Sequence, residues 1–588
     1  MFEVGLAKED FRFDCPGVGM LGYADYEQTV SGVRAPLSAR AFFVKNRTGA
    51  RLMIVVCELA WITQAVRHRV IETLEREHPE LELGEHNVLL TATHTHSGPG
   101  GYSHHLIYNI TVPGFVPEVF DAIVAAIVAA IVRACQTAQP GKLSVARGNI
   151  PLTEPVAFNR SVAAYNTNPD VIAVDPSSPE RATNRTMTVM RFDAANGEAL
   201  GALCWFGVHA TSLHSDNRHI DGDNKGHAAR QFERAMQPSN PGFVAAFAQT
   251  CPADVSPNFR WDAGKGVMAG AASDDVSNAK WNGGIQYRFA RKLYVRARKN
   301  PLTSDRIWSR VHYENHGRID VAKRYAPGVS GAKTHAPRFG MSMAMGTWDG
   351  RGPLFALPGV VGLLNRTAPW GLGPGAKYPL VDLSGAADSK LLALFSAENP
   401  RVPGWIYPAI DLLKVRAKRG IRQRAPWVPE VLPIQLVVLG SVAVAALPGE
   451  PSTVAGRRLE HGLLRKLRDS GVEQVVVAGY ANAYSSYIVT SHEYDAQAYE
   501  GGSTLFGPWT LAAYQTRFDT LAARMVAMPQ ATDVGIGETP YVANDDVLEW
   551  YPKRRPNMSA IAEARLLGAR FSTSRRRVSR SETLQSAV

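Results

Sequence analysis

Residues 87–96 read Asn-Val-Leu-Leu-Thr-Ala-Thr-His-Thr-His, a short apolar run that ends in His94 and His96. In an extended chain alternate side chains share a face, so these two imidazoles can both point at one spot beyond the carboxyl end of the strand. Imidazole is the commonest metal ligand, and the pair therefore suggests a metal site. A His-x-His pair also suits a loop cap or a buried core, so further ligands are needed before a metal is inferred.

Similar apolar runs recur along the chain and alternate with helical periodicity. Runs rich in Val, Ile, Leu and Ala are typical of strands buried on both faces, as in layered α/β proteins. The predicted strands are Leu52–Cys57, Asn87–Thr93, Leu200–Val208, Phe243–Gln249, Ile434–Leu439, Val442–Leu447 and Gln474–Ala478. The predicted helices are Gln64–Glu77, Pro117–Gln136, Gly226–Ala235, Ile285–Ala297 and Thr453–Asp469. We therefore expect an α/β fold in which helices flank a layered, mixed β-sheet.

The chain of 588 residues exceeds the usual size of a single core, so one large domain with insertions or two domains are expected. Residues 251–433 are rich in Gly, Pro and Trp, and apart from the one predicted helix we expect loops and small strands there. After residue 550 the composition shifts to Arg and Ser, which is typical of disorder. The predicted division is one large domain over residues 1–545 and a partly disordered basic extension over 546–588.

Composition narrows the class of protein. The chain is 45% hydrophobic and 20% charged, as globular proteins are, and its five dispersed cysteines include no Cys-x-x-Cys pair for a disulfide framework or thiolate zinc site. The N-terminus carries acids where a signal peptide is basic. The most apolar segment, Val119–Ala134, contains two charges and is shorter than the roughly 20 residues of a membrane span, so it reads as a buried helix. We expect a cytoplasmic or peripheral membrane protein, with secretion as the alternative.

The net charge of +11 is unevenly placed, with basic clusters over Lys414–Arg424 and from Tyr551 onward. Such runs are usually a solvated face or tail. The alternative is attraction to an anionic membrane surface, where each basic residue contributes about 1 kcal/mol. No nucleic-acid recognition motif accompanies the charge, so no nucleic-acid partner is expected.

Polar residues follow several of the apolar runs at the point where each run ends. In open α/β sheets ligands bind in the crevice outside the carboxyl ends of the strands, so these residues are expected at one rim. Beyond His94 and His96, they are His209, Asp254, Ser256, Glu450, Tyr484 and Tyr487. Two His with one carboxylate form a known catalytic zinc set, in which the metal activates water and polarises a carbonyl. The pattern predicts hydrolysis of an amide or an ester.

Each of these residues also has a structural interpretation. His209 can be a core histidine, and Glu450 can be an acid at the start of a helix, where acids are favoured. Ser256 fits a turn, Tyr487 a half-buried core and Arg160 a surface salt bridge. Only their joint placement favours a metal site.

Two further motifs are set aside. Residues 17–22 match the glycine spacing of a dinucleotide fingerprint, but no good strand precedes them and no helical pattern follows. Residues 221–226 suggest a calcium loop but lack the spacing and the terminal Glu of an EF-hand.

Two blocks of sequence are specific enough to indicate a family, Thr-His-Thr-His-Ser-Gly-Pro-Gly at 93–100 and Asp-Val-Ser-Pro-Asn at 254–258. With them stand Gly19–Tyr23, Asn159–Ser161, Val208–Ser212, Gly222–Gly226, Gly346–Gly350, Pro448–Glu450, Ala455–Leu459, Tyr499–Thr504 and Gly507–Pro508. In these stretches the chain resembles the neutral (non-lysosomal) ceramidases, zinc amidases that split ceramide into sphingosine and a fatty acid. The resemblance runs in the family's order to about residue 530.

The resemblance implies roles for particular residues. It implies one zinc ion per chain, held by His94, His209, Glu450 and Tyr487. It implies that His96 is the neighbouring acid/base, that Arg160 and Tyr499 hold the amide oxygen, and that Ser256 is the serine required for activity. Ser256 either attacks covalently or positions water and substrate, and the zinc-water route, which needs no nucleophilic serine, is favoured.

The chain departs from the family in three respects. The family's Gly before the Asp-Val-Ser-Pro-Asn block is Ala253 here, and its Arg before the Tyr-Glu-Gly block is Ala498. Typical members continue into an immunoglobulin-like C-terminal β-sandwich, which we expect this chain to lack. That expectation puts a second, structural calcium or magnesium ion at the domain junction in doubt.

Three hypotheses follow. In the first, the domain over residues 1–545 is a zinc amidase that hydrolyses the N-acyl amide bond of ceramide at a membrane or micelle surface. In the second, an amidohydrolase of the same fold acts on another N-acylated lipid or small molecule, because substrate-binding loops vary and residues 260–430 resemble the family least. The third, a lipid-binding protein with a damaged site, is opposed by the intact set of candidate ligands.

Overall fold

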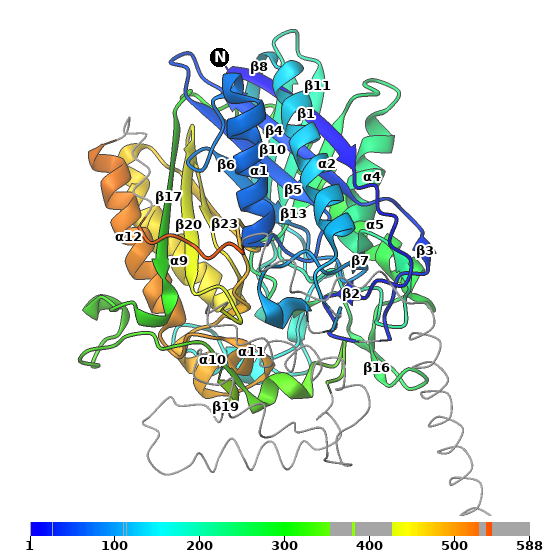
Figure 1. Cartoon of the computed structure of the whole chain (residues 1–588), viewed down its shortest axis with the longest axis vertical. Helices are drawn as coiled ribbons and strands as arrows, with labels where there is room; N and C mark the ends of the chain where they lie inside the picture. Colours follow the sequence, from blue (N-terminus) through cyan, green and yellow to red (C-terminus); the bar gives the residue numbers. More distant parts are fainter. Residues whose placement is uncertain are drawn as a thin grey trace, which may run out of the picture.

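Two β-sheets packed face to face form the centre of the molecule, and helices cover the outer face of each sheet (Figure 1). This computed structural model describes residues 2–352 apart from 26, 110 and 113, and then residues 379–382, 426–528 and 537–543. The four layers follow the order helix, sheet, sheet, helix, because each sheet must bury both of its faces.

The larger sheet has eight strands in the order β13-β11-β10-β8-β1-β4-β5-β6. Its strands are β1 (Phe2–Asp10), β4 (Ser38–Lys45), β5 (Arg51–Cys57), β6 (Val88–Ala92), β8 (Gln139–Asn149), β10 (Thr186–Ala194), β11 (Ala199–Trp205) and β13 (Val244–Ala248). The outermost pairs, β5 with β6 and β11 with β13, are parallel, whereas the inner pairs are antiparallel. Each parallel pair is connected through a helix, as parallel strands require.

The smaller sheet has four strands, β17 (Ile307–Asn315), β20 (Val431–Leu439), β21 (Val442–Ala446) and β23 (Gln474–Ala478). Its parallel pair, β21 and β23, is connected through α9 (Thr453–Leu467). The molecule therefore contains three βαβ units, and in each of them the carboxyl ends of the two strands lie at the same edge.

Helices pack on the outer faces according to their apolar stripes. The larger sheet is covered by α1 (Gln64–Glu77), α2 (Pro117–Gln136), α4 (Asp223–Met236) and α5 (Asp275–Ala297), and the smaller sheet by α9 and α12 (Thr510–Ala527). In α2, Ile123, Ile127 and Ile131 recur at steps of four and are all fully buried. Among the described residues, no helix has the length and apolar character that crossing a membrane requires.

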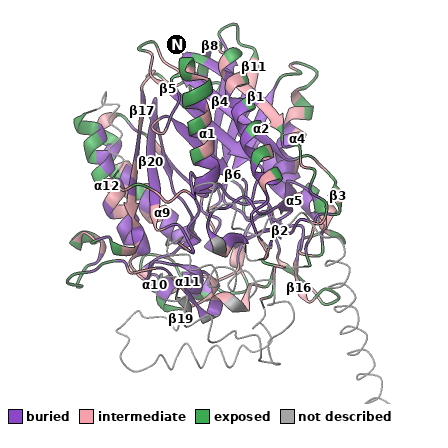
Figure 2. Cartoon of the chain, viewed as in Figure 1, coloured by how far each residue is buried: buried purple, intermediate pink, exposed green. Residues whose placement is uncertain are grey.

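The core between the sheets consists of side chains from both. Phe192 and Trp205 of the larger sheet and Val444 of the smaller sheet belong to one buried cluster. Figure 2 shows both sheets buried along most of their length, with exposure confined mainly to helix surfaces and loops. Burial of each large apolar side chain stabilises the fold by about 1.5–3 kcal/mol, so this interface holds the two halves together.

The structure confirms the mixed α/β class and most of the predicted elements. Helices α1 and α2 have the predicted bounds, and all seven predicted strands are present within a few residues. The predicted strand Leu200–Val208 is too long, because β11 ends at Trp205 and the chain turns toward the site. The single predicted sheet is divided between an eight-stranded and a four-stranded sheet, and short two-stranded sheets accompany them.

The region over residues 251–433 holds more regular structure than predicted. It contains all of α5, which begins ten residues before the predicted helix, and the strand β17. Strands β1, β4, β8 and β10 were not predicted either, since their polar residues interrupt the apolar pattern. The basic cluster Lys414–Arg424 and the C-terminal extension lie outside the described residues. The division at residue 545 and the lack of a C-terminal sandwich stay predictions.

Candidate metal centre

His94 and His209 meet at a short backbone bridge. The chain leaves β6 and β11 and pairs again at Thr95 with Ala210, in a parallel bridge that places the two preceding histidines side by side. The Nδ1 atom of His94 lies 2.8 Å from the Ala60 carbonyl oxygen, and that of His209 lies 2.7 Å from the Pro252 carbonyl oxygen. Because each Nδ1–H donates to a carbonyl, the Nε2 lone pair of each ring is available to a metal.

Glu450 and Tyr487 come from the smaller sheet and are paired in the same way. The two-residue strands β22 (Glu450–Pro451) and β24 (Tyr487–Ile488) are parallel, and Glu450 lies directly opposite Tyr487. The Oε2 atom of Glu450 is 3.4 Å from Nε2 of His209, and its Oε1 atom is 3.8 Å from Nε2 of His94. Two short bridges, one beyond the larger sheet and one beyond the smaller sheet, thus arrange the predicted ligands as two pairs, and Glu450 faces the histidine pair.

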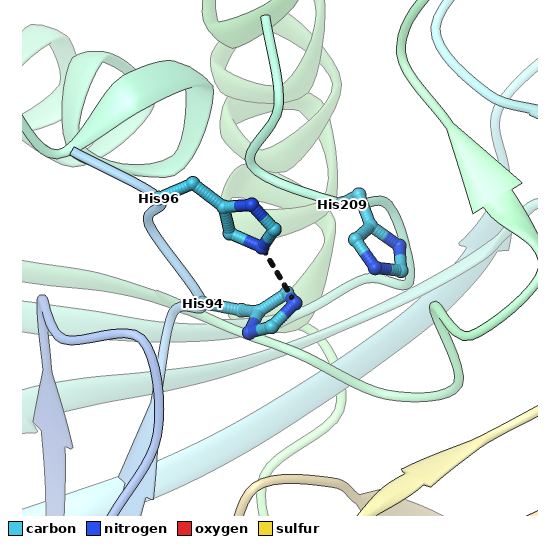
Figure 3. A group of neighbouring side chains, drawn as sticks. All are labelled: His94, His96 and His209. Carbon is cyan, nitrogen blue, oxygen red and sulfur yellow. Dashed lines mark hydrogen bonds between the residues drawn. The ribbon is translucent and has the colours of Figure 1, made fainter. Parts of the chain in front are cut away.

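His96 lies against the same pair of histidines. Its Nε2 atom is 3.0 Å from Nε2 of His94, and the ligand atoms of His94, His96 and His209 all lie within 4.8 Å of one another (Figure 3). This three-histidine group is a possible metal site.

The reason predicted for the meeting of His94 and His96 is wrong. Strand β6 ends at Ala92, and His94 adopts a left-handed backbone with φ of 67°, so a turn aims the two rings together and strand alternation does not. Such a conformation costs a non-glycine residue on the order of 1–3 kcal/mol and is concentrated at functional sites.

Burial controls the protonation of these groups. It lowers the pKa of His94 to about 4 and holds the pKa of His96 well below its usual value, so both rings are neutral at about pH 7. Burial alone raises the pKa of Glu450, but the facing histidines and the Tyr484 hydroxyl lower it below its usual value. Glu450 Oε2 is buried without a hydrogen-bond partner among the described residues, which fits a bound divalent cation.

An aromatic wall, formed by Trp61, Tyr480 and Tyr484, lies behind these ligands. Tyr480 stacks on His94 with ring centroids 4.1 Å apart, and Trp61 stacks on Tyr484 at 4.2 Å. The Tyr484 hydroxyl donates to Glu450 Oε1 over 2.5 Å. Tyr484 therefore orients the carboxylate, whereas Tyr487 lies beside it. Trp61 and Tyr480 were not singled out from the sequence, because aromatic residues in apolar surroundings read as core.

Arg160 is held beside Tyr487 by several groups. Its Nη2 atom donates to the Tyr487 hydroxyl (3.1 Å) and to the Ala253 carbonyl (2.7 Å), and its Nε atom donates to Glu500 Oε1 (2.9 Å). The guanidinium carbon lies 5.5 Å from the centre of the Tyr499 ring. The surface salt bridge considered for Arg160 is therefore wrong, since only 9% of the side chain is exposed and its partner Glu500 lies inside the site.

Two buried acids beside Arg160 were missed as individual residues. Glu500 pairs with it directly, and Asp349 Oδ2 lies 3.8 Å from its Nη1 atom. Both acids fall inside stretches that carry the family resemblance, and this was the only signal available, because an acid next to Gly or Trp has no distinctive local pattern.

Ser256 lies on a neighbouring strand pair. Strands β14 (Val255–Ser256) and β9 (Phe158–Asn159) are antiparallel, which places the Ser256 segment next to Arg160. The Ser256 hydroxyl accepts a hydrogen bond from the Asn258 amide (2.9 Å) and, among described residues, makes none with His96 or Glu450. Asp254 instead accepts from Thr453 at the start of α9, so it anchors the segment.

The motif at residues 221–226 has a structural role in the described fold. It begins helix α4, and the Asp223 carboxylate accepts hydrogen bonds from the backbone amides of Ser212 and Leu213. The Asn224 side chain donates to the His209 carbonyl (2.9 Å). These contacts support the segment that carries His209.

Comparisons with known proteins cover all of the candidate site residues. A family model described as neutral/alkaline non-lysosomal ceramidase, N-terminal, matches residues 2–360 and 411–516. The chain is 34% identical over 526 residues to the neutral ceramidase of Pseudomonas aeruginosa, covering 89% of this chain and 72% of that protein. It is 34% identical over 552 residues to the neutral ceramidase of Mycobacterium tuberculosis, covering 92% and 79%. A solved structure of a ceramidase complexed with C2 has a TM-score of 0.75 at 33% identity, covering 92% of this chain and 77% of that one.

Proposed function

This chain belongs to the neutral/alkaline non-lysosomal ceramidase family and is a ceramide-hydrolysing amidase, and we propose that it acts with one bound zinc ion. The proposed ligands are His94, His209, Glu450 and Tyr487. The proposal is supported by two parallel bridges, Thr95 with Ala210 and Glu450 with Tyr487, and by the Glu450 carboxylate, whose oxygens lie 3.4 Å from His209 Nε2 and 3.8 Å from His94 Nε2. Nitrogen and oxygen donors in such a set suit zinc.

A bound zinc ion supplies Lewis acidity toward a carbonyl oxygen and lowers the pKa of water near it. The rest of the chemistry falls to the chain's own residues. His96 is neutral and buried next to His94, which suits a group that takes a proton and returns it to the leaving amine.

Arg160 and Tyr499 are the proposed donors to the amide oxygen. Arg160 is fixed by Glu500 and the Ala253 carbonyl, so it is positioned before substrate binds. Donors already in position stabilise the developing negative charge, and removal of one often costs about 10²–10³ in rate. Ser256 is proposed to position substrate or water on the Arg160 side of the site.

The proposed substrate is the N-acyl amide bond of ceramide, with a sphingoid base and a fatty acid as products. Contact with an anionic membrane surface stays a prediction from the basic clusters. No second structural calcium or magnesium ion is proposed.

The test compares substrates and metal content in the purified protein. We expect stoichiometric zinc and fatty-acid release from ceramide that exceeds release from water-soluble N-acyl amino acids. Preference for the N-acyl amino acids would favour the second hypothesis, an amidohydrolase of the same fold with another substrate. A folded protein with neither zinc nor hydrolysis of either substrate would favour the lipid-binding hypothesis.

A further inference from the structure

The segments that follow the two edge strands of the larger sheet meet near the proposed ligands, where Gln249 contacts Thr93. In the strand order β13 and β6 stand at opposite ends, yet β13 contacts β4 and β5 across the curled sheet. The bridge between Thr95 and Ala210 joins the segments that follow β6 and β11. We call the junction between the segments that follow β6 and β11 the seam. The proposed ligands His94 and His209 lie on opposite sides of it, so the distance between them depends on the contacts that join the two segments.

One buried side chain spans the seam. Gln249, which directly follows β13 and is fully buried, donates from Nε2 to the Thr93 carbonyl (2.9 Å) and to the Val208 carbonyl (2.6 Å). Its Oε1 atom accepts from the Val208 amide (3.2 Å). Thr93 and Val208 immediately precede His94 and His209, so a single amide group ties together the backbones of both histidines.

We propose that Gln249 is a positioning residue that sets the distance between the two metal-binding histidines. The inference rests on the proposed function, because it assumes a metal bound at His94 and His209. The primary amide of glutamine matches the three backbone groups that surround it. Its two N–H donors serve two carbonyls at once, and its oxygen serves the Val208 amide.

Gln249→Glu is the informative variant because it keeps the shape and removes the donors. An ionised Glu has no donor, and a protonated Glu has only one, so at least one buried carbonyl loses its partner in either state. Gln249→Asn is the second variant, since it keeps the amide but is one methylene too short to reach both carbonyls.

Gln435 provides a matched control. It is equally buried on β20, and its Nε2 atom also donates to a backbone carbonyl, that of His86 (3.3 Å), and to the Ser309 hydroxyl (3.0 Å). It makes no hydrogen bond with either histidine segment, and its Oε1 atom accepts from Asn482 Nδ2 (2.8 Å), a contact that a Glu side chain can keep. Gln435→Glu therefore reports the structural cost of the same substitution without touching the seam.

The experiment measures the zinc dissociation constant by chelator competition, together with thermal unfolding of the metal-free proteins. We expect both Glu variants to unfold at lower temperature, but only Gln249→Glu and Gln249→Asn to bind zinc about 10–100-fold more weakly, as loss of partners behind metal ligands typically does. With saturating zinc, kcat for ceramide is expected to fall while KM stays unchanged.

Three results would overturn the inference or its premise. Wild-type zinc affinity in a folded Gln249 variant refutes the positioning role alone. Equal weakening by Gln435→Glu assigns the effect to general destabilisation and refutes it too. Failure of the wild-type chain to bind zinc refutes the proposed metal centre itself, whereas zinc binding without ceramide hydrolysis refutes only the substrate.

Discussion

Glu450 is the single residue on which the proposed metal centre depends most directly, because it faces both His94 and His209 and its Oε2 atom has no other partner among described residues. We expect Glu450→Ala to lose stoichiometric zinc and to reduce turnover by more than the roughly 10–100-fold that loss of an outer partner costs. Metal analysis and fatty-acid release measure the two effects. Glu450→Gln, which keeps the size of the side chain, is the matched control for packing.

Ser256→Ala is expected to behave differently from Glu450→Ala. Because the Ser256 hydroxyl makes no hydrogen bond with a proposed ligand among the described residues, the variant should keep its zinc while turnover falls. Full activity in either the Glu450 or the Ser256 variant would contradict the proposed roles.

At the scale of elements, helix α9 packs closely against Cys251, which precedes Ser256 in the chain. The contact lies at Gly456, where no side chain would fit without a shift. A Cβ atom added there would lie 1.9 Å from Cys251 Sγ. We expect Gly456→Ala to destabilise the protein by about 1–3 kcal/mol, since it overpacks this contact. Urea unfolding measures the loss, and Cys251→Ala in the same chain should restore part of it. No recovery in the double variant would show that the strain arises elsewhere.

The ion pair between α12 and β17 predicts a pH dependence. Burial alone raises the pKa of Glu314, but hydrogen bonds from His312 and from Arg517 lower it to about 2. A folded pKa below the unfolded value of about 4.5 adds stability that is present above pH 4.5 and is lost as the pH falls toward 2.

Arg517→Met tests this dependence. Arg517 donates to Glu314 from two nitrogen atoms, and removing it should cost about 1–2 kcal/mol at neutral pH. Urea unfolding of wild type and variant should give curves that converge as the pH approaches 2. A constant difference across the pH range would mean that the arginine acts through packing and not through charge.

At the scale of the whole molecule, the proposed metal joins the two sheets. His94 and His209 follow strands of the larger sheet, whereas Glu450 and Tyr487 follow strands of the smaller one. Zinc bound only in the folded state adds about 4 kcal/mol at a thousandfold excess over its dissociation constant. Chelation should therefore lower the unfolding midpoint as well as abolish turnover, and added zinc should restore both. An unchanged midpoint after full metal removal would contradict a bridging ion.

The sequence by itself determined the local elements and the chemical character of the site. Helix α2 was predicted with its bounds, because Pro117 and the isoleucines at steps of four act within one element. The apolar runs predicted the buried strands for the same reason. Residue type alone suggested metal ligands, and the family resemblance selected Tyr487 and Arg160, which local pattern assigned to core and surface.

Only the tertiary structure decided which strand ends meet. No local period predicts that the segments after β6 and β11 pair at Thr95 and Ala210, or that Glu450 lies opposite Tyr487. The sequence also did not predict the left-handed turn at His94 or the hydrogen bonds of the Gln249 amide to Thr93 and Val208. The physical reason is that these contacts join residues far apart in the chain, and their geometry arises only when the two sheets have packed and the larger sheet has curled.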